Sequence, residues 1–121
     1  MNIRQAVKPY VVERLHMAKS AFLNDQSKEG FRHLENAHVL GQHSTYFHTR
    51  VHFEMLKYGF RQGDTNEVFG QILRIIGAIT KTSLGLLPRG NTGGANVSAF
   101  KSMPISPENL AILDKIKHES K

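Results

Sequence analysis

Four residues of the chain have the types and spacing of ligands for a single metal ion. Glu35 and His38 are three residues apart, and His48 and His52 are four residues apart. Side chains at these spacings lie on the same face of a helix, so each pair can reach one ion. Imidazole nitrogens with a carboxylate suit a divalent transition metal (Zn, Ni, Co, Cu or Fe), and do not suit Mg or Ca.

Buried histidines also have a structural explanation that needs no metal. Their imidazoles can hydrogen-bond to backbone carbonyls, Gln42, Gln71 or Glu35. However, a neutral imidazole has one donor and one acceptor, and either is costly to bury without a partner. Two hypotheses therefore remain open, a metal site and a metal-free polar network. Because the chain has no cysteine, nitrogen and oxygen must supply any metal ligands.

The remaining polar residues do not define a reaction. A carboxylate-bridged di-iron bundle needs a second inward Glu-x-x-His pair, but Glu13 and His16, which have that spacing, are expected to face solvent. A hydrolytic zinc site needs a general base beside an open coordination position. Glu54 and Glu67 are the nearby carboxylates, and neither belongs to a catalytic motif. The sequence leaves open whether the protein is an enzyme.

The elements that must position these ligands are helices, because apolar residues recur at helical spacing through most of the chain. We expect helices over residues 2–23, 28–40, 45–62 and 65–84, with a short fifth C-terminal helix opening at Ser106 and Pro107. Short turns make consecutive helices antiparallel neighbours. The prediction is an all-α fold, a four-helix bundle of two antiparallel helical hairpins, in a single domain over residues 1–121.

The second and third helices are expected to bring the candidate ligands together. If the turn between them is centred near residues 42 and 43, His48 stands opposite His38. By the same count His52 stands about one turn further along, and Glu35 lies at a height between the two histidines. On the fourth helix, the most apolar stripe is expected to face inward, and it consists of Val68, Ile72, Ile75, Ile76 and Ile79.

A long loop rich in glycine and asparagine is expected between the fourth and fifth helices. It contains Gly90, Asn91, Thr92, Gly93 and Gly94. It is not a P-loop, because no Lys-Ser/Thr pair follows and no helix opens there. We interpret it as an ordered loop, with two alternatives: a lid over the histidines or a contact with a dimer partner. Further candidates for the site are Gln42, Gln71, Asn91, Thr92, Gly93 and Gly94.

Charge and hydropathy limit the classes of partner. The formal net charge is +6, but the basic residues are dispersed among acids, so the charge does not indicate nucleic-acid binding. The chain lacks a signal peptide and a membrane span, so we expect a cytoplasmic protein. An alternative function is a metal-free interaction module that binds a protein partner or forms a homodimer. This alternative rests on apolar side chains expected on outer faces, namely Phe47, Phe53, Phe69 and Leu73.

Several motifs have a recognisable order along the chain. They are the stretch from His33 to Gln42, His48-Thr49-Arg50-Val51-His52, Gly70-Gln71, and the stretch from Gly90 to Ser98. Together they resemble a bacterial family of small helical proteins catalogued as domain of unknown function 3703. The resemblance covers nearly the whole chain, from the first helix to residues 103–105. It implies no established activity, but its motifs contain the residues chosen above on chemical grounds.

Overall fold

The computed structural model describes residues 1–84, 93–94 and 102–120, and within them the chain forms five helices and no strand. The helices are α1 (Ile3–Leu23), α2 (Ser27–Gly41), α3 (Thr45–Gln62), α4 (Thr65–Leu84) and α5 (Pro107–Glu119). The predicted all-α class is therefore confirmed. The long loop expected after α4 lies outside the described residues, except for Gly93 and Gly94.

The helix starts show how the sequence sets these boundaries. Asn2 caps α1 in a capping box with Gln5, and the Ser44 hydroxyl accepts a hydrogen bond from the Phe47 backbone N–H at the start of α3. α2 begins one residue before the expected start at 28, because Ser27 is its first helical residue, and Gln26 precedes it without a side-chain cap. α1 begins at Ile3 and includes Pro9.

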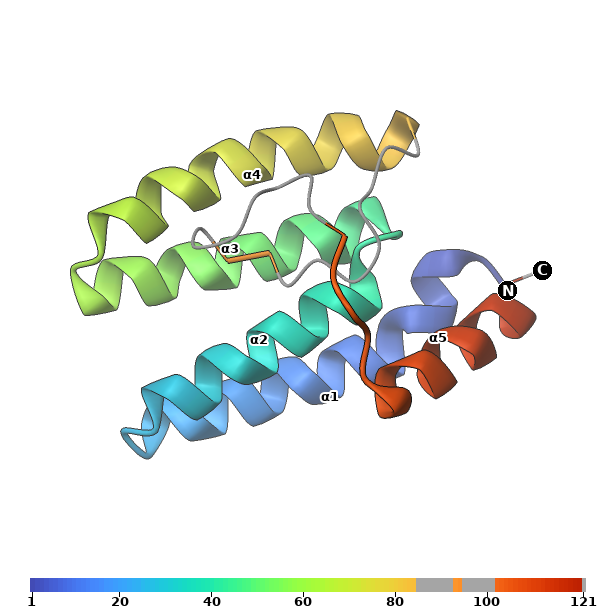
Figure 1. Cartoon of the computed structure of the whole chain (residues 1–121), viewed down its shortest axis with the longest axis horizontal. Coiled ribbons are helices and arrows are strands. Elements are labelled where there is room, and N and C mark those ends of the chain that lie inside the picture. The colour runs from blue at the N-terminus through green and yellow to red at the C-terminus, as the bar shows by residue number, and fades with distance from the viewer. Residues whose placement is uncertain (85–92, 95–101, 121) are drawn as a thin grey trace.

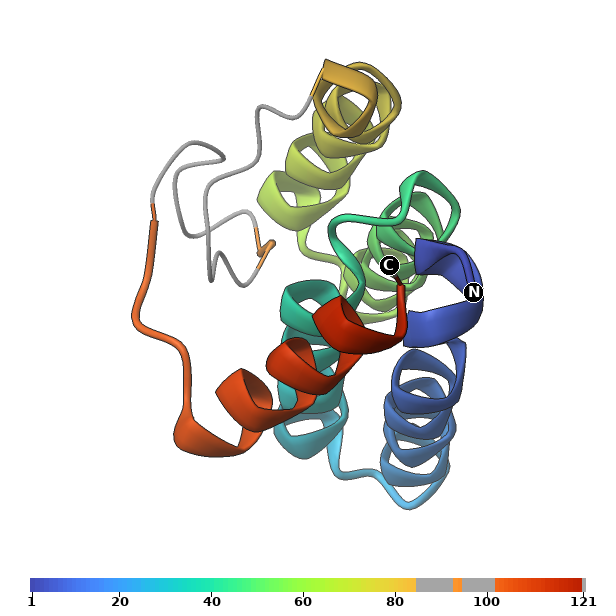
Figure 2. The same ribbon diagram turned by 90° about the vertical axis from the view of Figure 1, so that its right-hand side faces the viewer.

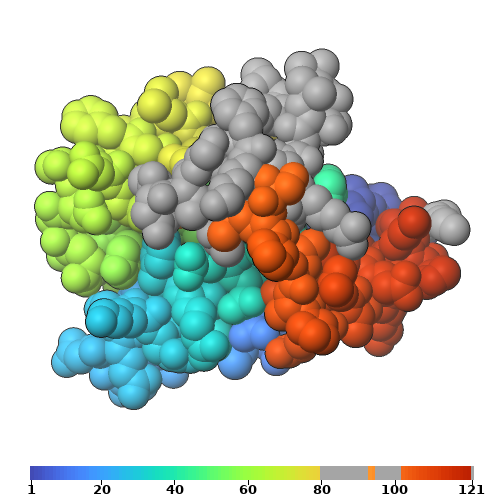
Figure 3. All heavy atoms as spheres, viewed as in Figure 1, coloured from blue at the N-terminus to red at the C-terminus, as the bar shows by residue number. Residues whose placement is uncertain are grey.

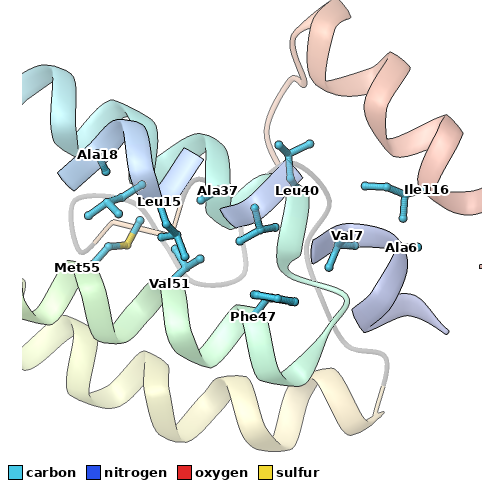
Figure 4. Close-up of a cluster of buried hydrophobic side chains, with 12 residues drawn as sticks. Ala6, Val7, Leu15, Ala18, Ala37, Leu40, Phe47, Val51, Met55 and Ile116 are labelled. Carbon is cyan, nitrogen blue, oxygen red and sulfur yellow. The ribbon is translucent and has the colours of Figure 1, made fainter. Parts of the chain in front are cut away.

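The helices pack as a bundle around a core built mainly by three of them (Figures 1 and 4). α1 packs against α2, α3 packs against α4, and contacts between α2 and α3 join the two pairs. α5 rests on α1 and α2, as the red atoms beside the cyan and blue ones show in Figure 3. The buried apolar cluster consists of Ala6, Val7, Val11, Leu15, Ala18, Leu34, Ala37, Leu40, Phe47, Val51, Met55 and Ile116.

α4 occupies a different position from the other helices. It packs on α3 alone among the described helices, on the side away from α1 and α2 (Figure 2). Its predicted inward stripe is largely wrong, because Ile72, Ile76 and Ile79 are 41 %, 61 % and 53 % exposed. The side turned toward α3 instead carries two buried polar residues, Glu67 and Gln71.

Two further expectations concern surfaces. Phe47 is buried in the core, so its predicted exposure is wrong, whereas Phe53, Phe69 and Leu73 are exposed as expected. The reason for Phe47 is its place in the first turn of α3, where it packs against α1 near Gly41 and Val11. None of the described helices combines the length and the apolar character needed to cross a membrane.

Candidate metal centre

Three histidine side chains meet between α2 and α3. The Nε2 atom of His38 lies 3.0 Å from that of His52 and 3.1 Å from that of His48, and the last two are 3.1 Å apart. The three nitrogens thus form a nearly equilateral triangle. A single ion can reach all three at about 2.0–2.1 Å, the usual metal–imidazole distance, if it lies about 1 Å out of their plane.

The local helical geometry explains this convergence. His48 and His52 are one turn apart on α3, and His38 faces them from the last turn of α2, as the count of heights along the two helices predicts. All three are buried, with exposed fractions of 2 %, 5 % and 2 % for His38, His48 and His52. Imidazoles in the middle of a helix–helix contact cannot be solvated by bulk water, so their nitrogens need partners within the protein or an ion.

Gln71 of α4 determines which nitrogen of His52 carries the proton. Its side-chain Nε2 donates to the Glu67 carboxylate at 2.7 Å and to the Gly93 carbonyl at 2.9 Å. Since both of these partners accept, the amide oxygen must be the atom that faces His52, 2.5 Å from its Nδ1. The His52 Nδ1 is therefore the protonated nitrogen, and its Nε2 presents a lone pair to the other two histidines.

Gly93 brings the chain beyond α4 directly onto the histidine cluster. It is buried and has a φ of +85°, a conformation that favours glycine. A Cβ at this position would lie 2.5 Å from His38 Cδ2 and 2.9 Å from His38 Nε2. Only a residue without a side chain fits there. Gly93, a candidate from the sequence, is thus at the site, and Gly94 after it is buried, whereas Asn91 and Thr92 lie outside the described residues.

Glu35 does not join the three nitrogens. Among the described residues, no carboxylate oxygen lies within 4.8 Å of all three histidine ligand atoms. Glu35 is half-buried, and burial together with the negative charge of Glu67 raises its pKa above the ordinary value. The height count considers only position along the helix axis, whereas residues i and i+3 also diverge by about 60° around that axis.

Three other buried polar residues, Gln42, Glu67 and His33, lie on α4 or at and near α2. Gln42 is buried at the end of α2, with an exposed fraction of 2 %. Glu67, considered only as a possible base, instead holds Gln71 one turn away, a link that its i, i+4 spacing on α4 makes possible. His33 is buried beside Arg14, and its pKa is lowered, first by burial and second by the positive charge of Arg14.

Comparison with known proteins identifies a family for this chain but no activity. A family model described as "Protein of unknown function (DUF3703)" matches residues 5–113. No curated protein and no solved structure matches the chain. The matched region includes all three histidines, Gln71 and Gly93, so the whole site lies within the family's extent.

Proposed function

The chain belongs to the DUF3703 family, and from the chemistry of its buried site we propose that it binds a divalent transition-metal ion through His38, His48 and His52. The observation that carries this proposal is the triangle of three Nε2 atoms, 3.0–3.1 Å apart, between α2 and α3. In this proposal the helices pair as two antiparallel hairpins, and the ion joins one hairpin to the other through His38 on one side and His48 with His52 on the other.

Neutral imidazoles cannot place a hydrogen bond in each of the three contacts among these Nε2 atoms. Because His52 Nε2 carries no proton when its Nδ1 donates to Gln71, at most two protons are available for three nitrogen–nitrogen contacts. At least one contact then holds two nitrogens about 3 Å apart with no proton between them, which is repulsive. An ion at the apex of the triangle accepts all three lone pairs at once, and this favours the metal site over the metal-free network.

The donor set indicates the class of ion. Three neutral imidazoles suit Zn, Ni, Co, Cu or Fe. Three protein ligands leave at least one coordination position for water or another small ligand, as in zinc sites that are not purely structural. Gln71 holds His52 by the second nitrogen, the usual arrangement around a metal-bound histidine, and Glu67 behind it supplies negative charge close to a buried cation.

Metal content of the tag-free protein tests the proposal. Protein prepared without chelator should contain close to one transition-metal ion per chain by elemental analysis, and the metal should raise Tm, because it binds the folded state only. The variant His48→Ala/His52→Ala should lose the ion. The single variant His48→Gln keeps a polar side chain of similar size and should bind at least about 100-fold more weakly.

The matched control removes the same number of histidines from the surface. His16→Ala/His118→Ala changes two exposed histidines on α1 and α5 and should keep the full metal content. Equal metal loss from both double variants would indicate adventitious binding to histidine side chains. A native protein without bound metal after growth in metal-replete medium would overturn the proposal. The histidine cluster would then be a metal-free polar network.

Acid should release the ion in a cooperative way. An imidazole must be neutral to bind a metal, so affinity should fall steeply as the pH drops below about 6. Because three imidazoles share the ion, the dependence on proton concentration should be steeper than first order. Competition with a chromophoric chelator between about pH 5 and pH 8 measures it, and a flat profile would contradict ligation by histidine.

A further inference from the structure

The outer face of α4 presents a continuous apolar stripe to solvent. Its five side chains lie on one side of the helix and are 41–70 % exposed, and they are Phe69, Ile72, Leu73, Ile76 and Ile79. A helix on the outside of a bundle normally turns such a stripe inward and its polar residues outward. In α4 the polar Glu67 and Gln71 face inward because they support His52, so the apolar side is left facing outward.

From this arrangement we propose that α4 is a self-association surface, on which a second copy of the chain packs its own α4. Specific interfaces bury at least about 1,000 Å² in total, and five large side chains exposed to this degree present roughly 500 Å² on each copy. Two copies together therefore reach the area that a specific dimer requires. Ordinary monomers carry largest apolar patches of about 300–600 Å², so this stripe is at the upper end for an uncovered surface.

The distribution of charge favours the α4 stripe as the place where two copies of the chain meet. Each chain carries a formal net charge of +6, so two copies repel each other across most of their surfaces. Between Thr65 and Ile79 the charged residues are Glu67, which is buried, and Arg74, which is partly buried and donates to the Gly70 carbonyl of its own helix. The stripe itself bears no charge, and an uncharged apolar face can meet its own copy without like-charge contacts.

The length and position of the stripe also fit a two-fold contact. From Phe69 to Ile79 the helix rises about 15 Å, enough for a short helix–helix contact. Leu73 lies near the middle of this segment and is 70 % exposed. In a symmetric helix pair, residues near the centre approach their own equivalents in the partner copy. α4 is also the outermost helix, with α3 between it and the rest of the bundle, so nothing in the described fold obstructs the approach (Figures 1 and 2).

Sedimentation velocity on the full chain tests the proposal, with a variant that charges the centre of the stripe. The native chain should be a dimer with a dissociation constant of micromolar order or tighter, and Leu73→Glu should weaken association at least about 100-fold by placing like charges together. The matched control is Leu23→Glu, which changes a leucine at the end of α1 that is 76 % exposed. It should leave the dimer intact. Unchanged helical circular dichroism shows that each variant is folded.

The absence of cysteine from the chain allows a direct check of the contact. Leu73→Cys should form an interchain disulfide under mild oxidation, whereas Leu23→Cys should not. A native chain that stays monomeric at about 100 μM, or a Leu73→Glu variant that dimerises as tightly as the native chain, would overturn the proposal. Binding of the monomer to lipid vesicles through α4 would overturn it as well, since the stripe would then cover a membrane surface instead.

Discussion

The interface between α1 and α2 and the interface between α3 and α4 differ in the kind of side chain at their centres. α1 and α2 meet through aliphatic residues such as Val11, Leu15 and Leu34, and their exposed sides are polar. α3 and α4 meet around His52 and Gln71, and α4 leaves its largest apolar residues exposed. The first pair therefore supplies most of the hydrophobic stability, and the second holds a polar site. Four experiments test this contrast, in order of decreasing expected effect.

The same substitution in the two pairs should have very different effects on stability. Leu34→Ala removes a side chain that is 1 % exposed from the core, and this should lower the free energy of unfolding by about 2–5 kcal/mol. Leu73→Ala removes one that is 70 % exposed, and in the dilute metal-free monomer it should change stability by less than about 0.5 kcal/mol. Urea denaturation measures both. Equal losses would show that α4 belongs to the core.

Loss of the amide that orients His52 should weaken metal binding. Gln71→Leu keeps the size of the side chain but cannot hold Nδ1, so affinity for the ion should fall about 10- to 100-fold. The control is Gln62→Leu, an exposed position at the end of α3, with no expected effect on affinity. Calorimetric titration with Zn²⁺ compares the two. An unchanged affinity for Gln71→Leu would remove the role assigned to this residue.

Alanine substitutions at two glycines with positive φ distinguish the effect of backbone strain from the effect of direct contact with the histidine site. Gly93→Ala and Gly63→Ala should each cost about 1 kcal/mol or more of stability, because φ is +85° and +65° at these positions. Only the alanine at 93 would press on the His38 ring, whereas nothing lies within 4 Å of a Cβ at 63. Metal affinity should therefore fall for Gly93→Ala alone. A similar fall for Gly63→Ala would mean that strain, and not contact, affects the site.

The smallest expected effect is a pH-dependent gain from Glu35→Gln. Burial, and secondarily the charge of Glu67, raises the pKa of Glu35 in the folded protein above its ordinary value of 4.5. The folded state thus binds this proton more tightly than the unfolded state, so its stabilising effect is present at low pH and is lost as the pH rises through the raised pKa. Metal-free Glu35→Gln should match the native Tm near pH 4 and exceed it at pH 7.

Thermal melts at both pH values measure this difference, with Glu13→Gln on the exposed side of α1 as the control. The control removes one carboxylate from the surface and leaves the half-buried Glu35 in place. A Glu35→Gln variant that is less stable than the native chain at pH 7 would show that the ionised carboxylate is held by a favourable contact in the folded protein.

The helices and the three central histidines follow from local sequence patterns. Apolar residues at helical spacing predict α1, α2 and α3 to within a few residues, and cap residues such as Asn2, Ser44 and Ser106 mark three of the starts. The i, i+4 spacing of His48 and His52 places them on one face, and a short turn brings His38 opposite. These features depend on neighbours along the chain, so the sequence contains the information directly.

Contacts between distant segments could not be predicted in the same way. The burial of Phe47 and His33 depends on how closely α1 approaches α2 and α3, and periodicity does not report that distance. The direction of the Glu35 side chain depends on the rotation of α2 about its own axis. Nothing in the spacing of Gly93 indicates that its backbone lies against His38 and accepts a hydrogen bond from Gln71.

α4 shows most clearly what the sequence determines and what tertiary packing determines. The sequence by itself determines that residues 65–84 form a helix with a strongly apolar side, because that pattern is local. Which side faces inward was decided only by tertiary packing. The facing surface of α3 carries His52, whose Nδ1 proton needs an acceptor, and Gln71 of α4 supplies it. An aliphatic residue there would leave that proton buried without a partner, so the polar side of α4 faces α3 and the apolar side faces outward.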